Sequence, residues 1–89
     1  MIERELTVSN RLGLHARATA KLVQVLAAFR SNVTLTAKGR EINAKSIMGV
    51  MLLAAGQGTP VKLRVEGEDE AAAADAVIAL FDRRFDEDI

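Results

Sequence analysis

The sequence predicts an α+β fold in which three helices cover one face of a four-stranded, mainly antiparallel sheet. Hydrophobic residues alternate with polar ones in four short segments and recur at helical spacing in three others, in the order β-α-β-β-α-β-α. The chain has 89 residues, of which 49% are hydrophobic, and it contains no cysteine. We therefore expect one domain over residues 1–89, stabilised by side-chain packing alone.

The first half of the chain predicts a strand, a helix and a hairpin. Residues 2–8 alternate between apolar and polar and indicate a half-buried strand. Residues 16–29 have the spacing of an amphipathic helix. Residues 32–37 and 40–43 then alternate as two strands, joined by a tight turn at residues 38–39. The helix should turn one apolar face to the core, formed by Ala18, Leu22, Val25, Leu26 and Phe29.

The second half predicts a short helix, a strand and a long helix. Ser46 can cap a short helix that continues through Leu53, and a connection containing glycine and proline leads to a strand over residues 61–66. The final helix opens with acidic residues 68–70 near its positive end and has arginines at 83–84 near its negative end. Its buried stripe should consist of Ala73, Ala76, Val77 and Leu80.

Composition excludes several classes of function. Twelve basic residues balance twelve acidic ones, so the chain has no general attraction to nucleic acid, and the absence of Tyr and Trp argues against RNA recognition by stacking. The N-terminus carries mixed charge, and no apolar stretch approaches the roughly 18 residues of a membrane span. With one histidine and no cysteine, we expect no metal and no cofactor. We expect a cytoplasmic protein without membrane insertion.

The candidate chemistry lies at His15, the only histidine, directly before the first strong helix. N–H groups in a first helical turn lack internal partners and suit phosphate, so the backbone of Ala16, Arg17 and Ala18 should bind one. The same helix end favours a neutral, nucleophilic imidazole. We expect His15 to carry a phosphoryl group and Arg17 to stabilise it by charge. The alternative, left open here, is that His15 is a solvent-facing cap and Arg17 a solubility charge.

Two apolar surfaces indicate docking of partners. In the first helix a stripe lies nearly opposite the core face, although the helix propensity of alanine alone could account for it. In the short helix Val50 and Leu53 can face the core, which leaves an exposed apolar patch that suits several partners. The docking residues are Ala16, Ala20, Val23 and Ala27 in the stripe and Ile47, Met48 and Met51 in the patch.

Three segments resemble the histidine-containing phosphocarrier (HPr) family. Residues 13–18, GLHARA, resemble its active-site motif, residues 45–51, KSIMGVM, its second-site segment, and residues 56–61, GQGTPV, the loop that follows. The resemblance implies an open-faced β-sandwich and a role in the phosphoenolpyruvate-dependent phosphotransferase system. On this resemblance Enzyme I donates the phosphoryl group to Nδ1 of His15, and an acceptor of the IIA kind receives it.

The resemblance also concerns regulation and pathway. It implies that a serine kinase/phosphorylase acts on Ser46, which could alternatively serve only as an N-cap. Ala18 stands where the family usually has Pro, a mild change in a first helical turn. The run over residues 79–88 resembles the nitrogen-related variant of the carrier, whereas the Ser46 segment resembles carriers regulated by a kinase. The two hints leave the pathway open.

Three competing functions remain at this point. A hydrolase or transferase acting alone lacks an evident base-nucleophile pair, since the chain has one histidine and no cysteine. Nucleic-acid binding is disfavoured by composition, as above. A regulatory binding module that leaves His15 unused is the more serious rival. We expect a monomeric, covalent phosphoryl carrier that works with partner enzymes rather than an enzyme that turns over alone.

Overall fold

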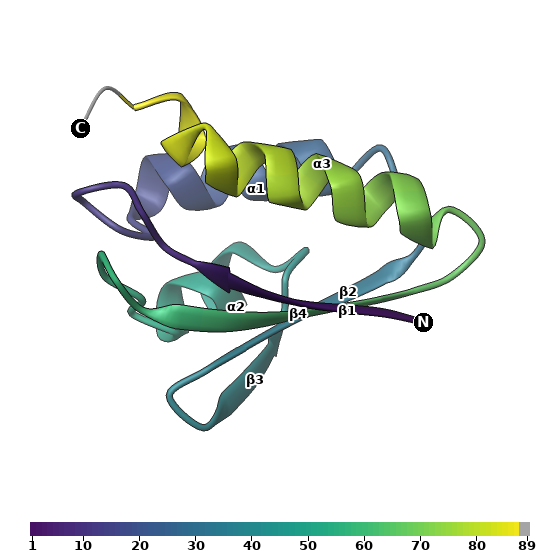
Figure 1. Ribbon diagram of the computed structural model, residues 1–89, viewed down its shortest axis with the longest axis horizontal. Coiled ribbons are helices and arrows are strands. Elements are labelled where there is room, and N and C mark those ends of the chain that lie inside the picture. The colour runs from purple at the N-terminus through teal and green to yellow at the C-terminus, as the bar shows by residue number, and fades with distance from the viewer. Residues whose placement is uncertain (88–89) are drawn as a thin grey trace.

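The computed structural model describes residues 1–87 and confirms the predicted element order (Figure 1). Residue 88, the end of the run that resembles the nitrogen-related variant, lies outside the described residues. A short 3-10 helix, η1, follows the last helix and was not predicted. The elements are β1 (Ile2–Thr7), α1 (Ala16–Leu26), β2 (Asn32–Ala37), β3 (Arg40–Asn43), α2 (Ile47–Leu52), β4 (Pro60–Glu66), α3 (Glu70–Asp82) and η1 (Arg84–Asp86).

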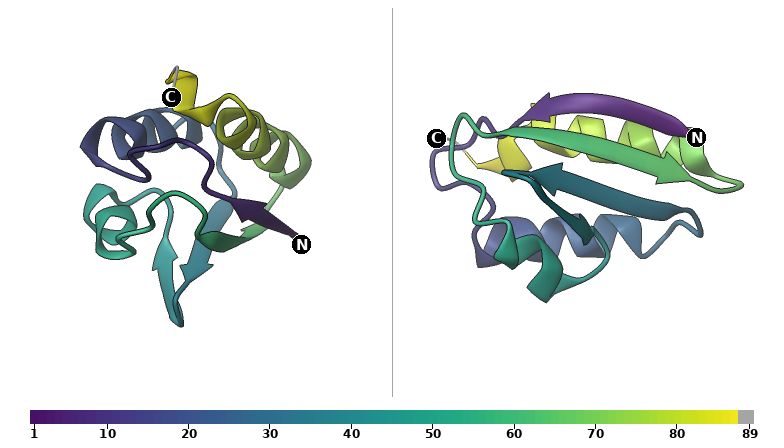
Figure 2. Two further views of the ribbon diagram at one scale, coloured as in Figure 1. Left: turned by 60° about the vertical axis from the view of Figure 1, so that its left-hand side comes forward. Right: turned by 90° about the horizontal axis from the view of Figure 1, so that it is seen from below.

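The four strands form one sheet in the order β1-β4-β2-β3, and every neighbouring pair is antiparallel. Leu63 in β4 pairs with Leu35 in β2, and Leu35 in turn pairs with Ile42 in β3. Helices α1 and α3 pack against each other on one face of the sheet, while α2 lies beside α1 and β3 (Figures 1 and 2). The opposite face is left open, which is the open-faced sandwich that the resemblance implied.

The core lies between the sheet and the helices. Of the residues predicted to form the core face of the first helix, Ala18, Leu22 and Leu26 are fully buried, whereas Val25 and Phe29 are half-buried. Helix α1 ends at Leu26, three residues before the predicted end. The chain tightens there into i→i−3 bonds, with the Phe29 N–H donating to the Leu26 carbonyl at 3.1 Å.

The last helix buries a broader stripe than predicted. Ala73, Val77 and Leu80 are buried as expected, but Ala76 is only half-buried. The core also takes in Ala74 and Phe81 from α3 and Phe85 from η1. The stripe widens because α3 contacts α1 as well as β1 and β4, so two adjacent sides of the helix are covered. Within residues 1–87 no helix combines the length and apolar character needed to cross a bilayer.

Candidate functional site

His15 is held at the start of α1 by the loop that precedes it. Its backbone is extended (φ −74°, ψ −179°), and it is the N-cap residue of the helix, so it lies directly before the first turn as the sequence predicted. The N–H of buried Leu14 donates to the Ala55 carbonyl at 2.9 Å. Gly13 has φ +69°, and a Cβ there would lie 2.5 Å from the Ala55 oxygen. The close approach of the two loops therefore requires glycine and fixes where His15 emerges.

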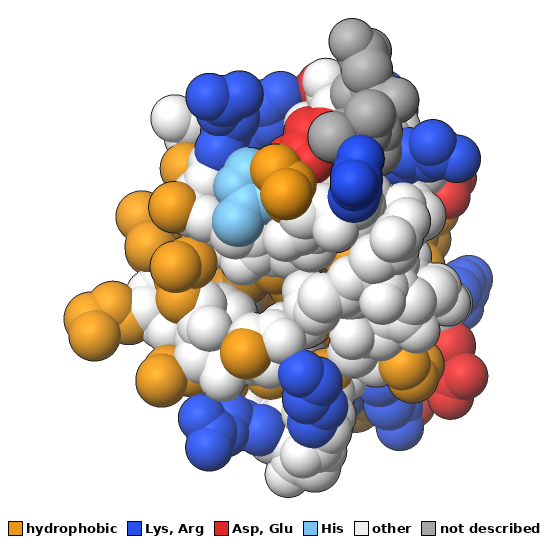
Figure 3. All heavy atoms as spheres, turned by 90° about the vertical axis from the view of Figure 1, so that its left-hand side faces the viewer, with side chains coloured by type: hydrophobic (Ala, Val, Ile, Leu, Met, Phe, Trp, Pro, Cys, Tyr) orange, Lys and Arg blue, Asp and Glu red, His pale blue; other side chains and the backbone are white. Residues whose placement is uncertain are grey.

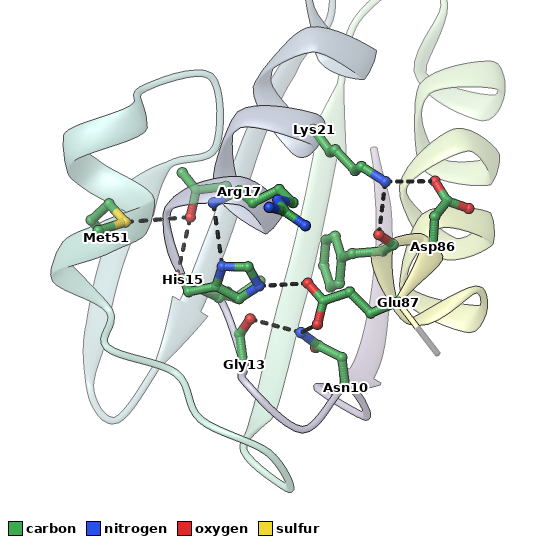
Figure 4. A network of polar contacts seen from close by, with 11 residues as sticks. Asn10, Gly13, His15, Arg17, Lys21, Met51, Asp86 and Glu87 are labelled. Atoms are coloured by element: carbon green, nitrogen blue, oxygen red, sulfur yellow. Dashed lines mark hydrogen bonds and ion pairs between the residues drawn. The ribbon is translucent and has the colours of Figure 1, made fainter. Parts of the chain in front are cut away.

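Both ring nitrogens of His15 have partners, as Figure 4 shows. Nδ1 faces the helix and accepts a hydrogen bond from the Arg17 backbone N–H at 3.3 Å. Nε2 faces away from the helix and lies 2.5 Å from Oε2 of Glu87. The side chain is 28% exposed, so solvent and partners reach the ring.

Glu87 was not among the predicted site residues. Its second oxygen, Oε1, accepts from Nδ2 of Asn10 at 3.1 Å, and the same Nδ2 donates to the Gly13 carbonyl at 2.8 Å. Asn10 is fully buried. Partial burial raises the pKa of the Glu87 carboxyl, but hydrogen bonds from Asn10 and His15 outweigh that effect and lower its pKa below the usual range. Glu87 is therefore ionised at neutral pH.

Glu87 reaches His15 through an unusual backbone, here called the C-terminal strap (residues 83–87). Arg84, Phe85 and Asp86 all have positive φ, at 55°, 56° and 62°, a conformation that costs non-glycine residues energy. Burial of Phe85, whose ring centroid lies 4.9 Å from that of Phe81, offsets this cost.

Lys21 of α1 anchors the strap from the other side. Its Nζ donates to the Phe85 carbonyl at 3.0 Å and to Oδ2 of Asp86 at 3.2 Å. The neighbouring Arg83 donates from Nε to Oδ1 of Asp86 at 2.9 Å. The hydrogen bonds from Arg83 and then Lys21 lower the pKa of Asp86. Lys21 thus ties the strap to the second turn of α1.

A hollow open to solvent lies between the start of α1 and the strap. Arg17 is exposed in the first turn, and Lys21 follows it by four residues on the same helix face. The amides of Ala16 and Ala18 belong to the same turn, and Ala18 itself is fully buried. The hollow is lined by Leu12, His15, Ala16, Arg17, Lys21, Asp86 and Glu87. It brings the predicted His15, Ala16 and Arg17 together with Lys21, which is paired with Asp86, and with the carboxylate of Glu87.

An apolar patch lies beside the histidine. Figure 3 shows hydrophobic side chains gathered to one side of His15. The predicted members Ile47, Met48 and Met51 are 51%, 76% and 43% exposed. The sequence analysis missed Leu12 and Leu52, although both are more than half exposed. We use the term apolar patch for these five residues.

The predicted stripe of α1 is less open than the apolar patch. Ala16 and Ala27 are exposed, whereas Ala20 and Val23 are half-buried. Buried Thr19 has two possible acceptors for its one hydroxyl proton, the Leu14 carbonyl at 3.2 Å and Sδ of Met51 at 3.6 Å. This contact joins the two helices that carry the two surfaces, so the stripe and the apolar patch lie on neighbouring elements.

Ser46 occupies the position that the sequence predicted. It is the N-cap of α2, and its Oγ accepts from the Gly49 N–H at 3.1 Å. It is half-buried and directly precedes the exposed Ile47. Across residues 1–87 no cluster of His, Cys, Asp and Glu has the arrangement of a metal site.

Known proteins resemble this chain over nearly its whole length. Residues 2–83 match the family described as PTS HPr component phosphorylation site. "Phosphocarrier protein HPr" of Xylella fastidiosa (strain Temecula1) is 66% identical over 88 residues, which cover 99% of each chain. "Phosphocarrier protein NPr" of Shewanella violacea is 40% identical over 97% of this chain and 94% of its own. The higher identity thus accompanies the HPr name.

A solved structure extends the likeness to the fold. The crystal structure of HPr-C-His from Thermoanaerobacter tengcongensis superposes with a TM-score of 0.96 at 40% identity and covers 100% of both chains. The match spans the His15 loop, the Ser46 segment and the strap alike. The chain belongs to the HPr family, the phosphocarriers of the phosphotransferase system.

Proposed function

We propose that His15 is the phosphoryl acceptor of this carrier and that Nδ1 is the reacting atom. The observation that carries the proposal is the position of Nδ1 at the N-terminus of α1, where it accepts from the Arg17 N–H at 3.3 Å. In the acceptor reaction the Nδ1 lone pair attacks phosphorus, and the donor's leaving group departs with the electron pair of its bond to phosphorus. The Arg17 N–H would then be close enough to donate to a phosphoryl oxygen.

Arg17 would stabilise the negative charge of the phosphoryl group. Its guanidinium is permanently charged and sits on an exposed first-turn side chain, so it can swing over a group on Nδ1. The amides of Ala16 and Ala18 belong to the same helix end and favour negative charge. Phosphoryl transfer depends mainly on positioning and charge stabilisation, so this small set suffices when a partner presents the phosphoryl group in line.

The proposed partners are Enzyme I as donor and an acceptor of the IIA kind. The apolar patch and the α1 stripe would form the contact surface, since exposed Met, Leu and Ile beside the reacting atom adapt to different partners. We propose one carrier domain over residues 1–89, acting as a monomer in the cytoplasm. It would act stoichiometrically, because the hollow supplies a nucleophile and cations and leaves the rest of the transfer machinery to the partner.

We propose regulation through Ser46 as a separate function of the second site. A serine kinase/phosphorylase would modify the hydroxyl that now caps α2. A phosphate at a helix N-terminus is tolerated by the helix, so the modification would act mainly on docking. Ile47 and Met48 of the apolar patch follow Ser46 directly in the chain, which places the new charge at the edge of the proposed contact surface.

Phosphorylation with purified Enzyme I and labelled phosphoenolpyruvate tests the carrier function. The protein should acquire acid-labile label, and His15→Ala should acquire none while keeping the parent's thermal unfolding curve. Label that persists in His15→Ala would refute His15 as the acceptor. Absence of label on the folded parent would favour a binding module, and steady phosphate release from a generic phosphate ester without Enzyme I would favour a self-sufficient enzyme.

A further inference from the structure

We propose that Glu87 is a positioning residue that holds His15 in the neutral tautomer with the proton on Nε2 and the lone pair on Nδ1. The inference rests on the proposed function of His15 and adds the group that prepares its ring. Carried by the C-terminal strap, Glu87 approaches His15 from a part of the chain 72 residues away.

The hydrogen bonds of Asn10 determine whether the Glu87 carboxylate donates or accepts. The Gly13 carbonyl can only accept, so the Asn10 atom that faces it is the donor Nδ2. The same Nδ2 faces Oε1 of Glu87. The opposite amide orientation would turn Oδ1 toward two acceptors. Oδ1 already lacks a partner among residues 1–87, so reversal would satisfy no group and break two hydrogen bonds. Glu87 therefore accepts on Oε1.

The same reasoning places the proton on the ring. Oε2 of ionised Glu87 can only accept, so Nε2 of His15 must be the donor. At the other side of the ring the Arg17 N–H points at Nδ1, which must therefore be an acceptor. A proton on Nδ1 would confront the Arg17 N–H directly. Among the forms of the ring, only the neutral tautomer with Nε2–H satisfies both contacts.

The strap shows that this contact is built into the fold. Three successive non-glycine residues in the left-handed region are energetically unfavourable. They are held by the buried ring of Phe85 and by Lys21, whose Nζ bonds both Phe85 and Asp86. Glu87 directly follows these anchored residues, and buried Asn10 holds its carboxylate from the other side.

The chemical consequence is that phosphoryl transfer can proceed without moving a proton on the ring. When the Nδ1 lone pair forms the bond to phosphorus, the ring keeps Nε2–H and becomes positively charged. The Glu87 carboxylate beside Nε2 neutralises that charge. On delivery, the Nδ1–phosphorus bond breaks, its electron pair returns to Nδ1, and the neutral Nε2–H ring is restored with atoms and charge balanced.

Imidazole ¹⁵N NMR of the unphosphorylated protein tests the tautomer directly. Spectra recorded at about pH 8.5, where imidazole side chains are neutral, should show a protonated Nε2 and an unprotonated Nδ1 in the parent. Glu87→Leu, which removes both acceptor oxygens, should move both ring shifts toward their tautomer-averaged values. Glu87→Gln keeps one acceptor oxygen and should lie between them. Glu68→Leu, an exposed glutamate in the connection before α3, is the matched control and should leave the ring shifts unchanged.

The rate of phosphoryl acceptance supplies the second readout. We expect Glu87→Leu to accept about tenfold more slowly than the parent, as for loss of one charge-assisted hydrogen bond, and Glu87→Gln to lose less. Parent-like ring shifts in Glu87→Leu would overturn the proposal, and so would a parent-like rate accompanied by altered shifts. The NMR test needs no donor, so it separates failure of this inference from failure of the proposed phosphoryl acceptance.

Discussion

The carboxylate of Asp69 accepts hydrogen bonds from both the backbone N–H of Ser31, at 2.9 Å, and the Ser31 hydroxyl. It also accepts from the Arg30 N–H at 2.8 Å. Asp69 is the residue before α3, and Ser31 is the residue before β2, so one side chain ties the start of the last helix to the start of a central strand. The Ser31 hydroxyl bond, followed by the Arg30 N–H bond, lowers the pKa of Asp69 to about 2.

This linkage predicts a specific acid sensitivity. Because the folded-state pKa is about 2 against 3.8 in the ordinary state, the ionised carboxylate stabilises the fold at pH values above 3.8. That contribution should be lost as the pH falls from 3.8 to about 2. Chemical unfolding from neutral pH down to about pH 2 should show Asp69→Asn less stable than the parent at neutral pH. The difference in the free energy of unfolding should shrink as the pH falls below 3.8. Asp75→Asn, on the exposed side of α3, is the control. A difference that stayed constant with pH would contradict the linkage.

Gly13 gives a second prediction, because it shapes the loop that carries His15. In Gly13→Ala the added Cβ would lie 2.5 Å from the Ala55 oxygen, and the residue would also have to keep φ +69°. Gly58 has a similar φ of +86°, but a Cβ added there would meet nothing within 4 Å. We expect Gly58→Ala to cost roughly 1–2 kcal/mol from backbone strain alone, and Gly13→Ala roughly 2–4 kcal/mol from strain and overlap together.

The two glycine variants are compared by chemical unfolding and by the rate of phosphoryl acceptance. Gly13→Ala should also slow acceptance, since the loops must separate and His15 must shift with them. Equal stability of the two variants would show that the Ala55 contact relaxes freely and does not position His15.

Local signals were sufficient for the helices and strands and for the N-cap of α2. Alternation and helical spacing predicted all four strands and three helices, because the chain has clear polar and apolar faces at these segments. Ser46 was predicted correctly as an N-cap because capping depends on the residue at one position, and His15 was placed correctly before α1 because the helical spacing begins just after it. The exposure of Met48 followed from the same helical geometry once Val50 faced the core.

The strap and its contacts could not be predicted in the same way. Glu87 meets His15 across 72 residues of chain, and no periodic pattern encodes such a contact. Phe85 adopts a left-handed backbone that its own propensity disfavours, and contacts with residues distant in sequence, including the hydrogen bond from Lys21 to its carbonyl, hold it there. Asn10 has the sequence context of an ordinary loop residue, although it is fully buried. These are long-range effects that override local preference.

Arg17 provides a third prediction, on the transfer step. Arg17→Ala should slow phosphoryl acceptance by about 10- to 100-fold without abolishing it, because His15 and the helix N-terminus remain. Arg17→Lys should recover part of the rate by restoring the charge without the planar guanidinium. Single-turnover kinetics with phosphorylated Enzyme I would measure both, and Arg4→Ala on edge strand β1 is the control for loss of a surface charge. A parent-like rate for Arg17→Ala would remove its charge-stabilising role.

The last prediction concerns charge at Ser46, which caps α2 through its bond to the Gly49 N–H at 3.1 Å. Ser46→Asp should weaken docking to Enzyme I by about tenfold. A carboxylate beside Ile47 and Met48 is costly to desolvate at an apolar contact, and negative charge on the partner would add repulsion. The helix should survive, because Asp is as good an N-cap as Ser.

Ser46→Asn separates the effect of charge from the effect of shape, since it keeps a capping oxygen and nearly the shape of Asp without the charge. Ser46→Ala removes the cap and should cost roughly 1 kcal/mol of stability while leaving affinity close to the parent's. Calorimetric affinity for Enzyme I and thermal unfolding would be measured for all three variants and the parent. Equal weakening by Asp and Asn would mean that shape rather than charge governs this edge of the apolar patch, and unchanged affinity in a folded Ser46→Asp would place Ser46 outside the docking surface.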